Sequence, residues 1–235
     1  MQIFQQFLLI APILLFSVIA HEIAHGWAAL RQGDRTALDA GRLTWNPKPH
    51  IDPFFTILLP IMTIAGSVAA GGRPMIFGGA RPVPVDPRNY RHPVRGDIIV
   101  SLAGVATNAL IVVGCVGLFA LAGWLGQSAP ALLATLGVVQ AMCMLGVQIN
   151  ALLIAFNLLP IPPLDGSHVF KYLLPRPLAV QYVRLARYGL LVLIALLWWG
   201  ERILTAWMNP FFAVADRLFS LADPLMLPTA VQWLR

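Results

Sequence analysis

The stretch Ser17-Val18-Ile19-Ala20-His21-Glu22-Ile23-Ala24-His25-Gly26-Trp27 is the part of the chain around which the fold is organised. It places two histidines and a glutamate inside an apolar run that begins near Ile3. On a helix, His21 and His25 project from one face about 6 Å apart along the axis, so both imidazoles can bind one Zn²⁺. Glu22 lies beside them and can act as a general base on a metal-bound water.

The alternative is that His-Glu-x-x-His occurs by chance on a solvated helix, where it is only polar surface. The flanking residues 7–16 and 27–30 are almost entirely apolar, which does not fit a solvated helix. A charged group deep in a bilayer costs about 2.5–3.5 kcal/mol even on the lenient insertion scale. The presence of ionisable residues in such a segment therefore favours a metal site over a chance occurrence of the motif.

The composition indicates an all-α polytopic membrane protein. Hydrophobic residues make up 58% of the 235 residues, charged residues only 11%, and the mean hydropathy is +0.75. Soluble domains have about 25% charged residues. Residues 98–164 contain no Asp, Glu, Lys, Arg or His, and this stretch is long enough for two spanning helices of about 20 residues each.

The net charge of +6 does not indicate nucleic-acid binding, because the basic residues lie in short loops between apolar runs and lack interleaved aromatics. Cys115 and Cys143 fall within expected spans and are interpreted as small apolar packing residues. Residues 1–20 contain no Lys or Arg, so the first apolar run is expected to be a retained span and not a signal peptide.

We expect about five to six transmembrane or re-entrant segments, near residues 3–30, 54–70, 98–124, 131–158, 178–199 and 203–221. Segment 54–70 either spans the membrane or dips in and returns. Re-entry is favoured because it keeps the basic residues of both flanking loops on one side. Segment 203–221 is either a last short span or an interfacial helix. Positive charge after the first span places residues 31–52 in the cytoplasm, so the histidine motif lies in the cytoplasmic half of that span.

A small β-hairpin is expected near the active site, with residues 36–38 and 42–45 flanking Asp39-Ala40-Gly41. An exposed strand edge within residues 36–46, or beside the re-entrant segment, would pair with the extended backbone of a substrate.

A catalytic zinc site usually needs a third protein ligand and an open position. Asp165 is the preferred third ligand, because three prolines at 160–163 must unwind the backbone before it. The alternative for Asp165 is the cap of a following helix. The other candidate ligands are His50, His92, His168, Asp97 and Glu201. Among these, His50 and His168 have either an auxiliary metal role or an ordinary loop role, and His92 is expected at the surface.

Three segments resemble the signatures of the site-2 protease family of intramembrane zinc metalloproteases. They are His-Glu-Ile-Ala-His at 21–25, Ala-Gly-Val-Ala-Thr-Asn at 103–108 and Asn-Leu-Leu-Pro-Ile-Pro-Pro-Leu-Asp-Gly at 157–166. The similarity extends over about residues 15–175, and Val105 departs from it where the family usually has proline. The chain looks like a minimal, core-only member: one membrane-embedded domain over 1–235, with the core at about 1–175 and C-terminal helices at about 178–221.

The resemblance implies one Zn²⁺ per chain, held by His21, His25 and Asp165, with Glu22 catalytic. It makes Asn157 the first candidate and Asn108 the second for the side-chain amide that stabilises the oxyanion. The alternative for both asparagines is a hydrogen bond between helices, worth about 0.6 kcal/mol in a membrane.

The implied activity is hydrolysis of peptide bonds in or near transmembrane helices of membrane-protein substrates, as in regulated intramembrane proteolysis. The expected location is the cell membrane, as a multi-pass protein with the active site towards the cytoplasm. The alternative is a catalytically silent zinc scaffold or a transporter, although Glu22 is present and residues 98–164 offer no charged path. The substrate and the oligomeric state stay open.

Overall fold

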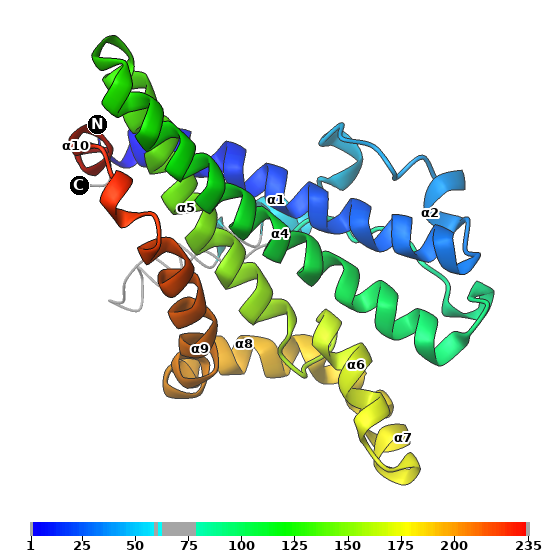
Figure 1. Ribbon diagram of the computed structural model, residues 1–235. Coiled ribbons are helices and arrows are strands. Elements are labelled where there is room, and N and C mark those ends of the chain that lie inside the picture. The colour runs from blue at the N-terminus through cyan, green and yellow to red at the C-terminus, as the bar shows by residue number, and fades with distance from the viewer. Residues whose placement is uncertain (1, 59–60, 63–78, 234–235) are drawn as a thin grey trace.

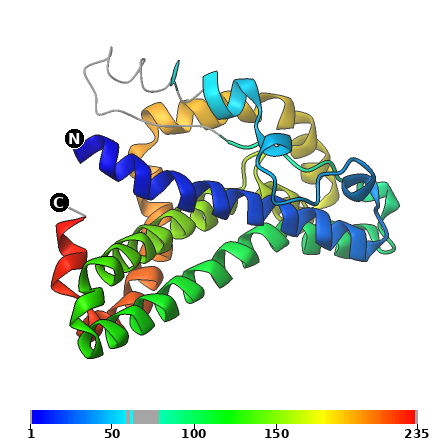
Figure 2. The ribbon, with the colours of Figure 1, turned by 90° about the horizontal axis from the view of Figure 1, so that it is seen from above.

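Three long helices form the centre of the computed structural model, which describes residues 2–58, 61–62 and 79–233. They are α1 (Gln2–Gln32), α4 (Pro93–Ser128) and α5 (Leu133–Asn157). The three pack against one another, and Figures 1 and 2 show them side by side. Small buried residues, among them Ala29, Ala151 and Ala155, allow the backbones to approach closely.

Shorter helices follow in the second half of the chain: α6 (Asp165–Leu173), α7 (Arg176–Leu185), α8 (Gly189–Trp199), α9 (Glu201–Ser220) and α10 (Pro228–Gln232). Helix α6 packs on α4, whereas α9 and α10 pack on α5. The Trp207 indole N–H on α9 donates to the Ala155 carbonyl of α5 at 2.7 Å. Cys143 is buried, and Cys115 packs against the same apolar cluster, as the sequence predicts.

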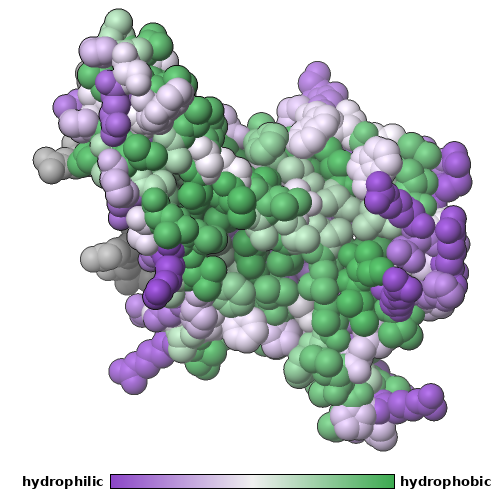
Figure 3. Space-filling view, viewed as in Figure 1, coloured by the Kyte–Doolittle hydropathy of each residue, from purple (hydrophilic) through white to green (hydrophobic). Residues whose placement is uncertain are grey.

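Four helical segments among the described residues are long and apolar enough to cross a membrane: 8–32, 93–128, 130–157 and 176–199. The last of these is divided into α7 and α8 by a short turn at Ala186–Tyr188. In Figure 3, apolar side chains cover the middle of the visible face, and hydrophilic ones gather at the end where α1 stops and α4 begins. The protein is therefore a multi-pass α-helical membrane protein.

The predicted total of five to six membrane segments is not confirmed. Helix α9 covers residues 203–220 of the predicted 203–221 segment but is not among the four candidate spans. Much of the 54–70 segment lies outside the described residues. Its described beginning, Pro53–Leu58, is a wide helical turn. Such a turn is compatible with a membrane span and with a re-entrant loop, so it does not decide between them.

The β-hairpin predicted around Asp39-Ala40-Gly41 is wrong. Residues Thr36–Asp39 form one helical turn, α2, and no strand occurs in the described ranges. The Asp34 carboxylate accepts the backbone N–H of Thr36, and this local bond favours a helical start over a strand. Gly41 then turns the chain with φ +65°.

Asp34 joins the end of α1 to the distant segment that precedes α4. This fully buried carboxylate accepts the backbone N–H of Asp86 at 2.7 Å and the Asn89 side-chain amide at 2.9 Å, besides its bonds to Thr36. Burial alone would raise the pKa of Asp34, but hydrogen bonds from Thr36, Asn89 and the Asp86 backbone hold that pKa below its ordinary value.

We expect acid to weaken this junction. Because the pKa of Asp34 is lower in the folded protein, its stabilisation is fully present above the ordinary carboxyl value of 3.8 and is lost as the pH falls further. Asp34→Asn should therefore lower the melting temperature in detergent by several degrees at pH 7, since hydrogen bonds to a charged group are worth about 1.5–3 kcal/mol. The difference between variant and wild type should shrink below pH 4. A constant difference across that range would contradict the assignment.

Candidate active site

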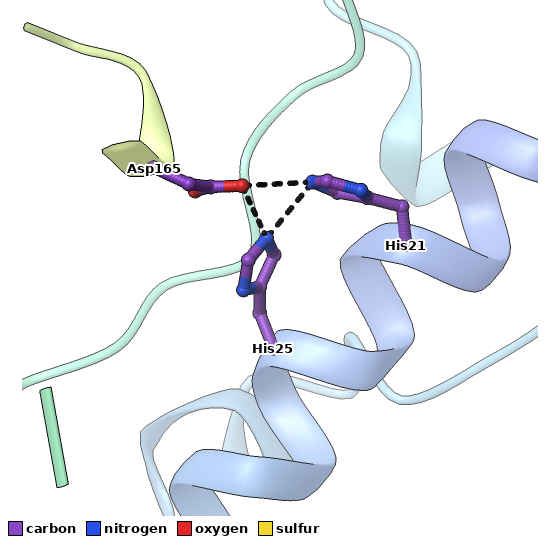
Figure 4. Close-up of side chains that lie close together, drawn as sticks. All are labelled: His21, His25 and Asp165. Carbon is purple, nitrogen blue, oxygen red and sulfur yellow. Dashed lines mark hydrogen bonds and ion pairs between the residues drawn. The ribbon is translucent and has the colours of Figure 1, made fainter. Parts of the chain in front are cut away.

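Three side-chain atoms from distant parts of the chain meet beside the C-terminal half of α1. His21 Nε2 and His25 Nε2 lie 2.9 Å apart, and Asp165 Oδ2 lies 3.2 Å from the first and 3.3 Å from the second. Figure 4 shows both imidazoles projecting from α1 towards the carboxylate at the start of α6. Both histidines are buried and Asp165 is mostly buried. The predicted convergence of these three residues is therefore present.

This triangle fits a tetrahedral zinc ion. With zinc–nitrogen and zinc–oxygen bonds of about 2.0–2.2 Å, neighbouring ligand atoms of a tetrahedron lie about 3.3–3.5 Å apart. The three measured separations of 2.9, 3.2 and 3.3 Å are close to that value. Asp165 Oδ2 is also buried and accepts no hydrogen bond from the described residues. A divalent cation supplies the positive charge that such a carboxylate oxygen needs.

Helix α4 sets the orientation of His25 and leaves room for both rings. His25 Nδ1 lies 2.7 Å from the Val100 carbonyl, so Nδ1 carries the proton and donates it, and the Nε2 lone pair faces the triangle. One turn further along α4, a Cβ added at Gly104 would lie 2.5 Å from His21 Nε2 and 2.6 Å from His25 Nε2. Only glycine admits the two imidazoles at this position.

Asp165 begins α6, and α6 is anchored to α4 by a polar cluster around Asp97. The buried Asp97 carboxylate lies 2.6 Å from Lys171 Nζ and 3.4 Å from His168 Nδ1, and it accepts the Tyr172 hydroxyl at 2.8 Å. All three partners lie on α6, within two turns of Asp165. Asp97 was only a candidate ligand in the sequence. Its position instead fixes the helix that carries the third member of the triangle.

Asp97→Asn should loosen that anchor and weaken metal binding without changing a ligand. Removing one partner of a buried ion pair typically costs 3–5 kcal/mol, because Lys171 loses its counter-charge. We expect zinc affinity, measured by competition with a chelator, to fall about ten-fold or more. Asp39→Asn is the matched control, because its pair with Arg35 is exposed and worth about 0.2–1 kcal/mol. Equal zinc affinity in both variants would exclude the anchoring role.

Glu22 follows His21 on α1 and makes a contact with Val83 that the sequence does not predict. Its Oε2 accepts the backbone N–H of Val83 at 2.7 Å. The buried Arg42 guanidinium holds this segment in place by donating to the Arg81 carbonyl at 2.7 Å and the Pro82 carbonyl at 3.3 Å. Residues 81–83 thus pass directly beside the candidate general base, while one carboxylate oxygen of Glu22 has no protein donor among the described contacts.

The two candidate amides lie in different surroundings. The Asn157 side-chain amide donates to the Leu153 carbonyl of its own helix at 2.9 Å. The Asn108 side chain is fully buried on α4, with its Nδ2 3.1 Å from His21 Nδ1. Asn108 therefore contacts His21, a member of the triangle. Asn157 is the last residue of α5 and precedes the proline-rich segment that leads to Asp165.

The remaining histidine and acidic candidates do not join the triangle. His50 is buried with its Nε2 3.0 Å from the Thr44 carbonyl, and His168 pairs with Asp97. His92 is exposed at the start of α4, as expected, and Glu201 is exposed at the start of α9. Among the described residues, His21, His25 and Asp165 are the one cluster of metal-ligating side chains.

Comparisons with known proteins agree with this geometry. The model of the family described as "Peptidase family M50" matches residues 117–197. The chain is 35% identical over 183 residues to "Putative zinc metalloprotease YwhC" of Bacillus subtilis (strain 168), covering 78% of this chain and 77% of the relative. It is 31% identical over 227 residues to "Putative zinc metalloprotease Rip2" of Mycolicibacterium smegmatis (strain ATCC 700084 / mc(2)155). This match covers 93% of this chain and 80% of the relative. No solved structure matches.

Proposed function

This chain belongs to peptidase family M50, the site-2 protease family of membrane metalloproteases, and on that basis we propose that it cleaves transmembrane proteins within the bilayer. The proposed activity is zinc-dependent hydrolysis of peptide bonds in or near a substrate's membrane-spanning helix. The observation that carries it is the convergence of His21, His25 and Asp165 beside a helical segment that is long and apolar enough to cross a membrane. A zinc site beside such a segment meets substrates that lie in the membrane.

The proposed ligands are the three atoms of the triangle, which leave a fourth position for water or substrate. Zinc held there supplies a Lewis acid that makes water reactive near neutral pH. The proposed role of Glu22 is to remove a proton from the attacking water and to return it to the leaving amine nitrogen. The Val83 N–H holds one oxygen of the Glu22 carboxylate, which keeps the side chain oriented and leaves the other oxygen to take the proton.

A side-chain amide is proposed to stabilise the oxyanion formed when water adds to the peptide carbonyl. Removal of one such donor typically costs about 2.7–4 kcal/mol in the transition state. Asn157 is the candidate. Among the described contacts, its amide donates to the carbonyl of Leu153 one turn back, and a rotation about its side-chain bonds would exchange that partner for a substrate oxygen.

The substrate must unwind locally before it reacts. In an intact helix the carbonyl oxygen already accepts the N–H four residues later, so it is not free to be bound by zinc or by an amide donor as water attacks. Helix-breaking residues such as Gly and Pro near the cleaved bond should therefore increase the rate. Residues 36–46 form no strand, so they do not offer a strand edge that could pair with the unwound segment of the substrate. Residues 79–86 run beside Glu22 without regular structure and are the better-placed neighbour.

We also propose the orientation of the enzyme in the membrane. Its four spans would lie in the cell membrane, with residues 1–235 acting as one membrane-embedded domain. The basic residues after α1 then face the cytoplasm, which puts the metal triangle in the cytoplasmic half of the bilayer. Cysteine labelling of an exposed residue in the 34–52 loop from each side of sealed vesicles distinguishes the two orientations.

The proposed activity is tested by mapping the bond that is cut. Purified protein and a panel of single-pass membrane substrates are reconstituted together in liposomes, and the masses of the products are determined by mass spectrometry. We expect new termini inside or within a few residues of the substrate's span, and loss of cleavage when a chelator removes zinc. Cuts confined to soluble loops, or chelator-resistant cleavage, would contradict intramembrane zinc proteolysis.

A further inference from the structure

Asn108 makes a contact that an oxyanion donor would not need. Its side chain is fully buried on α4, its Nδ2 lies 3.1 Å from His21 Nδ1, and its Oδ1 has no hydrogen-bond partner among the described residues. A buried amide oxygen without a donor is unfavourable by about 1–3 kcal/mol. Asn108 Oδ1 is thus a buried hydrogen-bond acceptor without a described donor, on a side chain that contacts the imidazole of a proposed metal ligand.

The chemistry of His21 supplies that proton. To bind a cation, Nε2 must present its lone pair towards Asp165 and His25. A neutral imidazole then carries its hydrogen on Nδ1, and Nδ1 becomes a donor that needs an acceptor. An amide NH₂ group cannot accept this hydrogen, but the amide oxygen can. A half-turn of the Asn108 amide exchanges its oxygen and nitrogen with almost no change of shape.

We propose that the side-chain oxygen of Asn108 accepts the His21 Nδ1–H and holds this imidazole in the tautomer and orientation that bind zinc. Asn108 is thus a positioning residue and not the oxyanion donor. This inference rests on the proposed zinc site. Metal-binding histidines generally donate their second ring N–H to such an acceptor, and loss of the acceptor typically lowers metal affinity 10–100-fold.

The spacing along α4 supports the assignment. Val100, Gly104 and Asn108 are four residues apart, so they lie on one face of the helix over about two turns. The Val100 carbonyl accepts from His25 Nδ1, Gly104 makes room for both rings, and Asn108 reaches His21 Nδ1. One helix face therefore orients both imidazoles, each through the nitrogen that points away from the metal triangle.

The test measures Zn²⁺ affinity by chelator competition in purified protein, which does not depend on a substrate. Asn108→Leu and Asn108→Ala remove the acceptor and should bind Zn²⁺ 10–100-fold more weakly. Asn108→Asp keeps an acceptor oxygen and should lose much less Zn²⁺ affinity than the Leu and Ala variants. The matched control is Asn150→Leu, since Asn150 is another fully buried asparagine, which bonds to Ser17 on α1 without touching the triangle. The control should keep wild-type Zn²⁺ affinity even if its melting temperature falls.

The outcomes separate this proposal from the proposed activity. Wild-type Zn²⁺ affinity in Asn108→Leu or Asn108→Ala, together with slower cleavage, would overturn positioning and return Asn108 to an oxyanion role. Equal losses in Asn108→Asp and Asn108→Leu would also overturn it. If wild type binds Zn²⁺ no better than His21→Ala, the zinc site itself is wrong. If Zn²⁺ affinity follows the expected order but no substrate is cut, the positioning role holds and the proteolytic activity fails.

Discussion

Glu22→Gln should lower kcat for cleavage of a transmembrane substrate by about 10²–10⁴-fold, the usual contribution of a general base. Glutamine has nearly the same shape and can still accept the Val83 N–H, but it cannot take a proton from water. Because Glu22 is not one of the three ligand residues, the zinc content should stay the same as in wild type. The measurement combines product formation in liposomes with metal analysis of the same protein samples.

Glu201→Gln serves as the matched control for Glu22→Gln. It makes the same chemical change at an exposed position at the start of α9, and it should leave both kcat and zinc content unchanged. Turnover by Glu22→Gln at the wild-type rate would exclude Glu22 as the base. Loss of zinc together with activity would instead show that Glu22 supports the metal site.

Gly104→Ala should strongly reduce zinc affinity and activity by adding one methyl group. The new Cβ would lie 2.5 Å from the Cε1 and Nε2 atoms of His21, and that Nε2 also lies 3.2 Å from Asp165 Oδ2. Either the imidazoles or helix α4 must move, and a displacement of about 1 Å at a reacting centre can cost 10²-fold in rate. We expect zinc affinity to fall at least ten-fold and cleavage at least 10²-fold.

Gly114→Ala provides the comparison on the same helix. A Cβ at Gly114 meets nothing within 4 Å, so this variant gains helix propensity without a clash. Its melting temperature should equal or exceed that of wild type, with zinc affinity unchanged. If Gly104→Ala binds zinc as tightly as Gly114→Ala, the close packing of α4 on the two histidines is not required for the site.

The sequence predicted the convergence of His21, His25 and Asp165 because each of the two segments has a local signature. Spacing of four residues places His21 and His25 on one helix face, and the prolines at 160–163 end α5 just before Asp165. Long apolar runs likewise predicted the three central helices to within a few residues at most ends. Such patterns depend only on neighbours along the chain.

The contacts that position the site could not be predicted in this way. Asp97 meets α6 more than seventy residues later, and Val83 meets Glu22 across 61 residues, so no local pattern links these pairs. Gly104 has no local signature of a site in the sequence, and only the three-dimensional arrangement shows that it faces the imidazoles. The hairpin prediction failed because the Asp34 carboxylate accepts the Thr36 backbone N–H and favours a helical turn where residues flanking Asp39-Ala40-Gly41 had indicated strands.

The ligand set itself is tested most directly by zinc K-edge X-ray absorption on the purified protein, paired with metal analysis of an Asp165→Ala variant. We predict one zinc per chain in wild type, with two imidazole nitrogens and a carboxylate oxygen at about 2.0–2.2 Å. The Asp165→Ala sample should lose zinc or the oxygen contribution at that distance. A wild-type spectrum without imidazole scattering, or an unchanged spectrum and zinc content after removal of the Asp165 carboxylate, would contradict the account.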